Sequence, residues 1–184
     1  MNKNIFFIFI IFSIITGFCK NTKFDFSNQD LSRKDFSGSN FSGSKFINTN
    51  LNNSILKNSK LKNVDFTNAN LSYCNLSSSD LRGSILKNSD LFSSDLSYCN
   101  LKKLDFSNLN LDNVDFSGSD LRNCSFENAS LIEAKFNGAD LTGANFKGAN
   151  VTLEQLYNAK TLKDVILPFG TKYNANLKKG DKNE

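Results

Sequence analysis

Few residues of this chain are suited to chemistry, and two aspartates are the strongest candidates for catalysis. The 184 residues include no histidine and no Cys-x-x-Cys pair, so we expect no metal and no other cofactor. Asp95 and Asp115 are 20 positions apart, and a chain that returned on itself at that spacing would stack them, which could raise one carboxyl pKa. Aspartate also alternates with asparagine at equivalent positions, and a flat carboxylate pair lacks the enclosing pocket of a usual active site. The sequence therefore predicts that the protein is not an enzyme.

Basic side chains form a second group, mostly at the same spacing of 20. They are Lys60, Lys62, Arg82, Lys102, Lys103 and Arg122. Like charges that stack closely repel one another, and Asp80 and Asp120 would partly offset this column. Two interpretations stay open. The column is either a solvated face neutralised by its aspartates, since exposed charges contribute little, or a shallow face that binds a protein or an anionic surface ligand.

A repeat with a period of five decides where all of these side chains lie. Counting in fives from Phe26 to Val151 gives 26 positions, and every one before Val151 is Leu or Phe. The residue two places earlier is usually small, the residue directly before is usually Asp or Asn, and the two that follow are mostly polar. A period of five fits neither a helix nor a strand. It requires a chain that turns a corner once in each repeat, with one large apolar residue inward on each side.

This pattern resembles the A(D/N)LXX motif of the pentapeptide-repeat proteins, as in residues 139–143 (ADLTG) and 144–148 (ANFKG). The resemblance covers residues 24–153 without a break. It implies an all-β fold, a right-handed quadrilateral parallel β-helix in which four repeats make up each coil. Positions that differ by 20 would then stack in neighbouring coils.

Ladders in the sequence support a coil of four repeats independently of the family. Asparagine recurs at positions 28, 48, 68, 88, 108 and 128. The inward position of that side is Phe in six of seven coils, whereas the inward position of the next side is Leu from residue 31 to residue 131 and never Phe. A period of 15 or 25 would mix these columns.

Three of the four cysteines occupy equivalent positions in this repeat. Cys74, Cys99 and Cys124 are evenly spaced along the chain, and each step equals one coil plus one side. Export would permit disulfides, but a coil spacing of about 4.8 Å and the step to the next side put their Cα atoms beyond the roughly 7 Å reach of a disulfide. We therefore expect three free, buried thiols that fill space as small apolar groups.

The repeat divides the rest of the chain into a solenoid over residues 24–151, a helical cap over 152–167 and a polar tail over 168–184. The cap is predicted because Thr152 and Gln155 have the spacing of a capping box, and apolar residues then recur at helical spacing as far as Pro168. At the other end Gln29 and Lys34 occupy positions that are small elsewhere. They are a poor template for further coils.

The segment 1–19 is typical of a secretory signal peptide. Lys3 precedes an apolar run over residues 5–15, which has the length of a signal core and is short for a spanning helix. Residues 15–19 (ITGFC) resemble the lipobox of bacterial lipoproteins, which implies lipidation of Cys19, although Phe18 is larger than the residue that this motif prefers. An uncleaved membrane anchor is the alternative.

Charge and targeting together predict a non-catalytic scaffold or binding module that is exported to the periplasm or cell envelope and held to the membrane by lipid. Residues 24–153 carry 13 basic and 14 acidic side chains. A rod so close to neutral is not a polybasic nucleic-acid binder. Some members of the resembled family mimic DNA and bind topoisomerases. That alternative is disfavoured here, since it needs an acidic rod in the cytosol.

Overall fold

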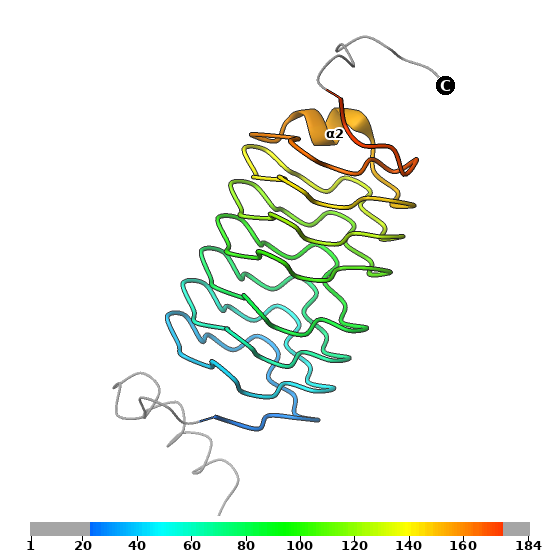
Figure 1. Ribbon diagram of the computed structural model, residues 1–184. Helices are drawn as coiled ribbons and strands as arrows, with labels where there is room; N and C mark the ends of the chain where they lie inside the picture. The colour runs from blue at the N-terminus through cyan, green and yellow to red at the C-terminus, as the bar shows by residue number, and fades with distance from the viewer. Residues whose placement is uncertain (1–22, 175–184) are drawn as a thin grey trace, which may run out of the picture.

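The chain winds into a stack of coils, seen from the side in Figure 1. The computed structural model describes residues 23–174, so the predicted signal segment, Cys19 and residues 175–184 of the predicted tail lie outside it. Parallel bridges join positions that differ by 20, from Asp25 with Lys45 to Ser130 with Asn150. They recur at intervals of five residues, with one interruption described below, so each coil has four sides. The coil length predicted from the ladders is confirmed by these bridges.

A regular repeat satisfies all five of its backbone N–H groups, as residues 66–70 show. Three of them donate to carbonyl groups of the neighbouring coils at 2.8, 2.9 and 3.0 Å, and the N–H of Ala69 donates to the carbonyl of Phe66 at 2.9 Å. The remaining N–H, of Thr67, donates to Oδ1 of Asp65 at 2.9 Å. An Asp or Asn before each inward residue therefore caps an amide that the coils cannot reach, which explains the preference for it.

A left-handed residue makes each corner. Every fifth residue from 28 to 148 has φ between 54° and 74°, and it is followed by the donor of the turn hydrogen bond, as in a type II turn. Most of these residues are Asn or Gly, the types that adopt positive φ at least cost. On one side of the rod the asparagines also bond to one another, for example Asn48 Nδ2 to Asn28 Oδ1 at 2.9 Å.

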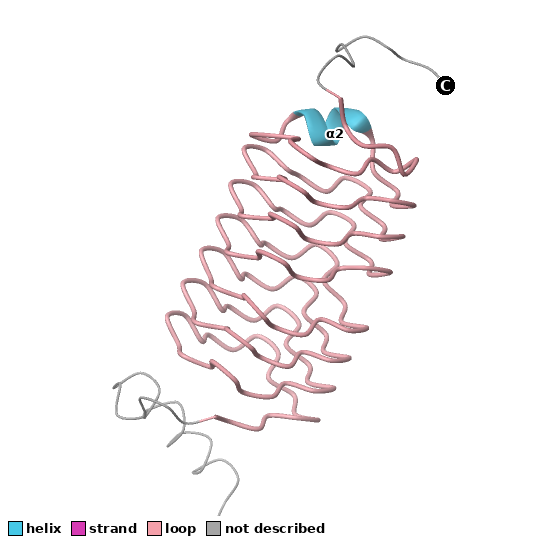
Figure 2. Cartoon of the chain, in the orientation of Figure 1, coloured by secondary structure: helices cyan, strands magenta, loops and turns pink. Residues whose placement is uncertain are grey.

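The paired positions are single bridges and not extended strands (Figure 2). The chain turns a corner after each bridge, so two consecutive residues never pair across coils. The described residues hold one short helix, α2 (Leu153–Tyr157), and no named strand, so the β character of these residues consists of isolated bridges.

The core consists of a large and a small inward position. The Leu or Phe of every repeat from Phe26 to Phe146 is buried, and so is the small position from Ser39 to Ala149, whereas Gln29 and Lys34 are exposed. Several serine, threonine and cysteine side chains at the small position donate to a carbonyl of the coil below. Thr49 Oγ1 donates in this way to the carbonyl of Phe26 at 2.8 Å, and Ser79 Oγ to that of Leu56 at 2.8 Å.

The C-terminal cap differs from the helical segment predicted over residues 152–167. The capping box is present, since Gln155 N–H donates to Thr152 Oγ1 at 3.2 Å and the amide of Thr152 donates to Gln155 Oε1 at 2.9 Å. The helix nevertheless ends at Tyr157, and Thr161 and Ile166 pair with the last regular coil. Buried Leu162 and Leu167 continue the spacing of the repeat. Residues 161–167 therefore form a further partial coil and not a continuation of the helix.

One stretch of the rod departs from the regular pairing. Between residues 83–91 and residues 102–110, here called the seam, the bridges expected at Ile85 with Asp105 and at Asp90 with Asn110 are absent. The six hydrogen bonds that the pattern places there are absent too. Pairing resumes at Ser93, whose N–H donates to the carbonyl of Asp112 at 2.9 Å.

Candidate binding face

The predicted basic residues lie together on one side of the rod. Parallel bridges place Lys60 next to Asp80, Asp80 next to Asn100, and Asn100 next to Asp120. Lys62, Arg82, Lys102 and Arg122 each directly follow the inward Leu of the same side, so they form a column across four coils. Together with Lys60 and Lys103 they make up what we call the basic face.

Two arginines of the basic face are held in place by carboxylates. Arg82 binds Asp80 through two hydrogen bonds, Nε to Oδ1 at 2.9 Å and Nη2 to Oδ2 at 2.8 Å. Arg122 binds Asp120 in the same way, at 2.7 and 2.6 Å. Such two-pronged pairs fix the guanidinium plane, unlike a single ammonium contact.

The same contacts keep the carboxylates ionised. Hydrogen bonding from Arg82 lowers the pKa of Asp80 from 3.8 to about 2, and the partial burial of Asp80 opposes this only in part. The pKa of Asp120 is also lowered, chiefly by its hydrogen bonds from Arg122. Asp80 and Asp120 are therefore ionised over the ordinary pH range.

The carboxylates do not neutralise the basic face completely. Lys62 Nζ lies 3.3 Å from Asp80 Oδ2, and Arg122 Nε lies 3.8 Å from Asp140 Oδ2. Lys60, Lys102 and Lys103 form no ion pair with any described residue. Six cations thus face three carboxylates, and three lysines are left to attract an anionic group.

The two aspartates considered for catalysis have a structural role. Asp95 and Asp115 are neighbours across adjacent coils, as predicted. Each accepts the N–H of the serine two places later, Ser97 at 2.9 Å and Ser117 at 2.8 Å. Both therefore cap a turn like the aspartates of other repeats, and their positions follow from the consensus.

The three cysteines within the described residues are free and buried, as predicted. The thiols of Cys74, Cys99 and Cys124 donate to carbonyls of the coil below at 2.9, 3.0 and 3.0 Å. Burial raises the pKa of Cys74 to about 11 and that of Cys99 and Cys124 to about 12. Because the thiolate is the reactive form, these cysteines are inert fillers in the folded protein.

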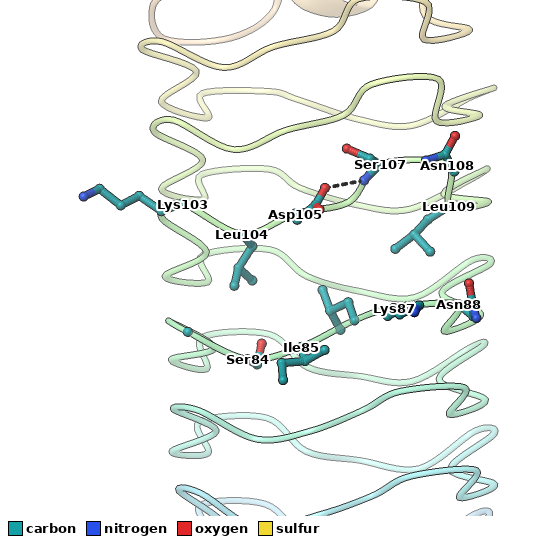
Figure 3. Close-up of a pocket in the computed structure, with 12 residues that line it drawn as sticks. Ser84, Ile85, Lys87, Asn88, Lys103, Leu104, Asp105, Ser107, Asn108 and Leu109 are labelled. Atoms are coloured by element: carbon teal, nitrogen blue, oxygen red, sulfur yellow. Dashed lines mark hydrogen bonds between the residues drawn. The ribbon is translucent and has the colours of Figure 1, made fainter.

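The seam contains the residues that sequence reasoning missed. A cavity of about 560 Å³ opens there, with Leu104 and Leu109 on one rim and Ser84 to Asn88 on the other (Figure 3). The signal was present in the sequence, since Leu104 and Leu109 are the two leucines at small positions of the regular repeats. Among the described residues, no group of three His, Cys, Asp or Glu side chains is arranged to hold a metal ion.

Coils of four repeats with a corner in each repeat define the class of this protein, a four-sided solenoid. The sequence matches the family described as Pentapeptide repeat region over residues 19–96 and 59–136. The chain belongs to the pentapeptide-repeat family. No protein with curated annotation matches it.

Solved structures of other family members resemble the rod. HetL from the cyanobacterium Nostoc, a protein involved in regulating heterocyst differentiation, is 24% identical, with 81% of this chain and 78% of that chain covered and a TM-score of 0.46. A pentapeptide repeat protein of the Arabidopsis thaliana thylakoid lumen is 27% identical over 71% of this chain and 74% of its own, with a TM-score of 0.38. QnrB1, a plasmid-mediated fluoroquinolone resistance protein, is 18% identical over 78% and 89%, with a TM-score of 0.37.

Proposed function

We propose that this protein is an exported, non-catalytic binding module, tethered to the membrane through a lipidated Cys19, that uses its basic face to bind an anionic partner protein. The observation that carries the proposal is the surplus of three lysines, Lys60, Lys102 and Lys103, beside carboxylates already bound to arginines. A column of cations on a regular scaffold attracts a complementary anionic surface and orients it.

The tether of this proposal lies in the segment before the rod, where residues 15–19 resemble a lipobox. Within residues 23–174 no helix has the length and apolar character needed to cross a membrane. Two acyl chains, or one acyl chain together with a basic patch, hold a protein stably to a bilayer.

The tether is tested by fractionation. The variant Cys19→Ser should move the protein from the membrane fraction to the soluble fraction, and the wild-type chain should begin at an acylated Cys19 by mass spectrometry. Unchanged fractionation, or a mature chain that begins elsewhere, would contradict lipidation.

The basic face is tested by affinity capture from the cell envelope, with quantitative mass spectrometry of the bound proteins. The variant Lys60→Gln/Lys102→Gln/Lys103→Gln should lose a set of acidic partners that the wild type retains. The matched control is Lys45→Gln/Lys57→Gln/Lys135→Gln, which removes the same charge from other positions of the rod. If both triple variants capture the same partners as the wild type, the basic face is not the binding surface.

A further inference from the structure

The seam leaves backbone hydrogen-bonding groups of both coils without partners. On one rim the N–H groups of Gly83, Leu86, Asn88 and Leu91 lack the carbonyl acceptors that every equivalent amide has between residues 26 and 81. On the other rim the N–H groups of Asp105 and Asn110 are also unpaired. Both rims therefore present unpaired backbone groups, as the open edge of a β-sheet does.

Two bulky residues account for the opening. The small inward position holds Ser, Thr, Ala, Cys or Val in the other repeats from residue 39 to residue 149, but it holds Leu104 and Leu109 in two successive repeats. In Figure 3 both leucines extend from their coil toward the coil below. Extra volume in two successive repeats holds the two coils apart, because a packed interior does not absorb added methylene groups without backbone shifts.

The resulting cavity contains a buried polar group without a partner. Ser84 is 8% exposed, its Oγ has no hydrogen-bond partner, and it lines the cavity opposite Leu104. Leaving a buried hydroxyl unpaired costs free energy unless something binds it. Much of the remaining lining is apolar, with Leu86, Leu104 and Leu109, or consists of the unpaired backbone.

We propose that the seam is a binding site for an extended peptide segment, which enters between the two coils and pairs with them through its main chain. A chain in this position supplies both donors and acceptors, which the two rims require, and addition of a strand to an open edge is a general mode of peptide recognition. A small polar ligand would leave the three leucines of the lining uncovered.

The lining also defines the side chains of the peptide. A medium-sized apolar residue fits against Leu86, Leu104 and Leu109, as the inward residue of an ordinary repeat does. Lys87, Lys103 and Asp105 are the charged residues of the lining, so its charge is positive by one and an acidic residue next to the apolar one is favoured near the lysines. The preferred peptide therefore has the composition of one repeat, an acidic residue followed by an apolar one. The site meets the basic face at Lys103 and otherwise lies on different residues.

The proposal is tested by titrating the full chain with a blocked octapeptide that has the sequence of residues 139–146, ADLTGANF. At about 1 mM peptide, a dissociation constant near 0.1 mM would slow hydrogen exchange of the Leu86, Asn88 and Leu91 amides about ten-fold. Amide chemical shifts should change at the seam and not at Leu111 or Leu121, where pairing is complete. The same peptide with alternate backbone nitrogens methylated should have no effect, since it cannot donate to the rims.

Two variants complete the test. Leu104→Ala/Leu109→Ala should close the seam, so that its amides are protected without peptide and the peptide no longer shifts them. Val64→Ala/Val114→Ala is the matched control, because these two small positions lie where the coils pair fully, and it should respond to the peptide as the wild type does. No peptide effect on the wild type, or an equal effect of the methylated peptide, would overturn the proposal.

Discussion

Residues 111–131 and residues 83–91 are built from the same pentapeptide repeat and differ in how firmly they hold to the next coil. In the first stretch every inward residue donates its N–H to the coil above, for example Leu121 to Asp140 at 3.0 Å. In the second, Leu86 and Leu91 have no such bond. A single repeat motif therefore does not guarantee uniform cohesion. Two coils pair fully only where the residue at the small inward position of the facing coil is small.

The largest difference between the two stretches is expected for truncations in the core. Phe126 is stacked between Phe106 and Phe146, with ring centroids at 5.0 and 4.7 Å. Phe126→Ala should lower the free energy of unfolding by about 3–5 kcal/mol. Leu86→Ala borders an existing cavity and should cost only about 2 kcal/mol, the low end for a buried leucine. Denaturant unfolding measures both, and equal losses would mean that the seam is packed like the rest of the core.

The second prediction concerns the leucines that open the seam. In an ordinary core two Leu→Ala changes would cost at least about 4 kcal/mol together. We expect Leu104→Ala/Leu109→Ala to cost less than about 2 kcal/mol, because closure of the seam restores inter-coil hydrogen bonds worth about 1 kcal/mol each. A loss of the full amount in denaturant unfolding would show that these leucines are well packed and that the coils do not close without them.

A smaller effect is expected from the aspartates that cap the turns. Asp65→Ala removes the acceptor of the Thr67 N–H and should cost about 1 kcal/mol. Ser97→Ala, at an outward position of another repeat, should cost less than about 0.5 kcal/mol. If the two changes had the same effect on thermal unfolding, the capping role of the aspartate would be wrong.

The smallest effect is a dependence on acid. The pKa of Asp80 is lowered from 3.8 to about 2 in the folded protein, so its stabilising contribution is present above about pH 4 and is lost as the pH falls toward 2. The wild type should exceed Asp80→Asn in stability by under about 1 kcal/mol at pH 6, as expected for a surface pair. The difference should shrink as the pH falls from 4 to 2, through the folded-state pKa of Asp80. A difference as large at pH 2 as at pH 6 would contradict the assigned ion pair.

Much of this architecture could be predicted from the sequence because the repeat specifies each side chain by position. The inward Leu and Phe, the Asn ladder and the buried free cysteines all follow from counting in fives and twenties. The capping box at Thr152 and Gln155 could also be predicted from the sequence. The shortness of α2 could not, since Leu162, Val165 and Ile166 fit a helix as well as a further coil, and only the backbone pairing of Thr161 and Ile166 decides between them.

The basic face and the seam also differ in how much of them the sequence predicts. The column of cations was visible in the sequence, but the two-pronged bonds of Arg82 and Arg122 to their aspartates depend on side-chain geometry. The seam depends on the combined volume of Leu104 and Leu109, two large residues at small positions of consecutive repeats. When each repeat is considered separately, they are two ordinary apolar residues, and the separation of the coils is not predicted.

Amide hydrogen exchange of the free protein tests the contrast between the regular coils and the seam most directly. We expect slow exchange for the inward amides of Leu71, Leu111 and Leu121, which donate to the neighbouring coil. Exchange at Leu86 and Leu91 should be at least roughly 100-fold faster, since these amides have no hydrogen bond to the next coil that must first break. Equal protection of all five amides would contradict this expectation, because the coils would then pair without interruption along the whole rod.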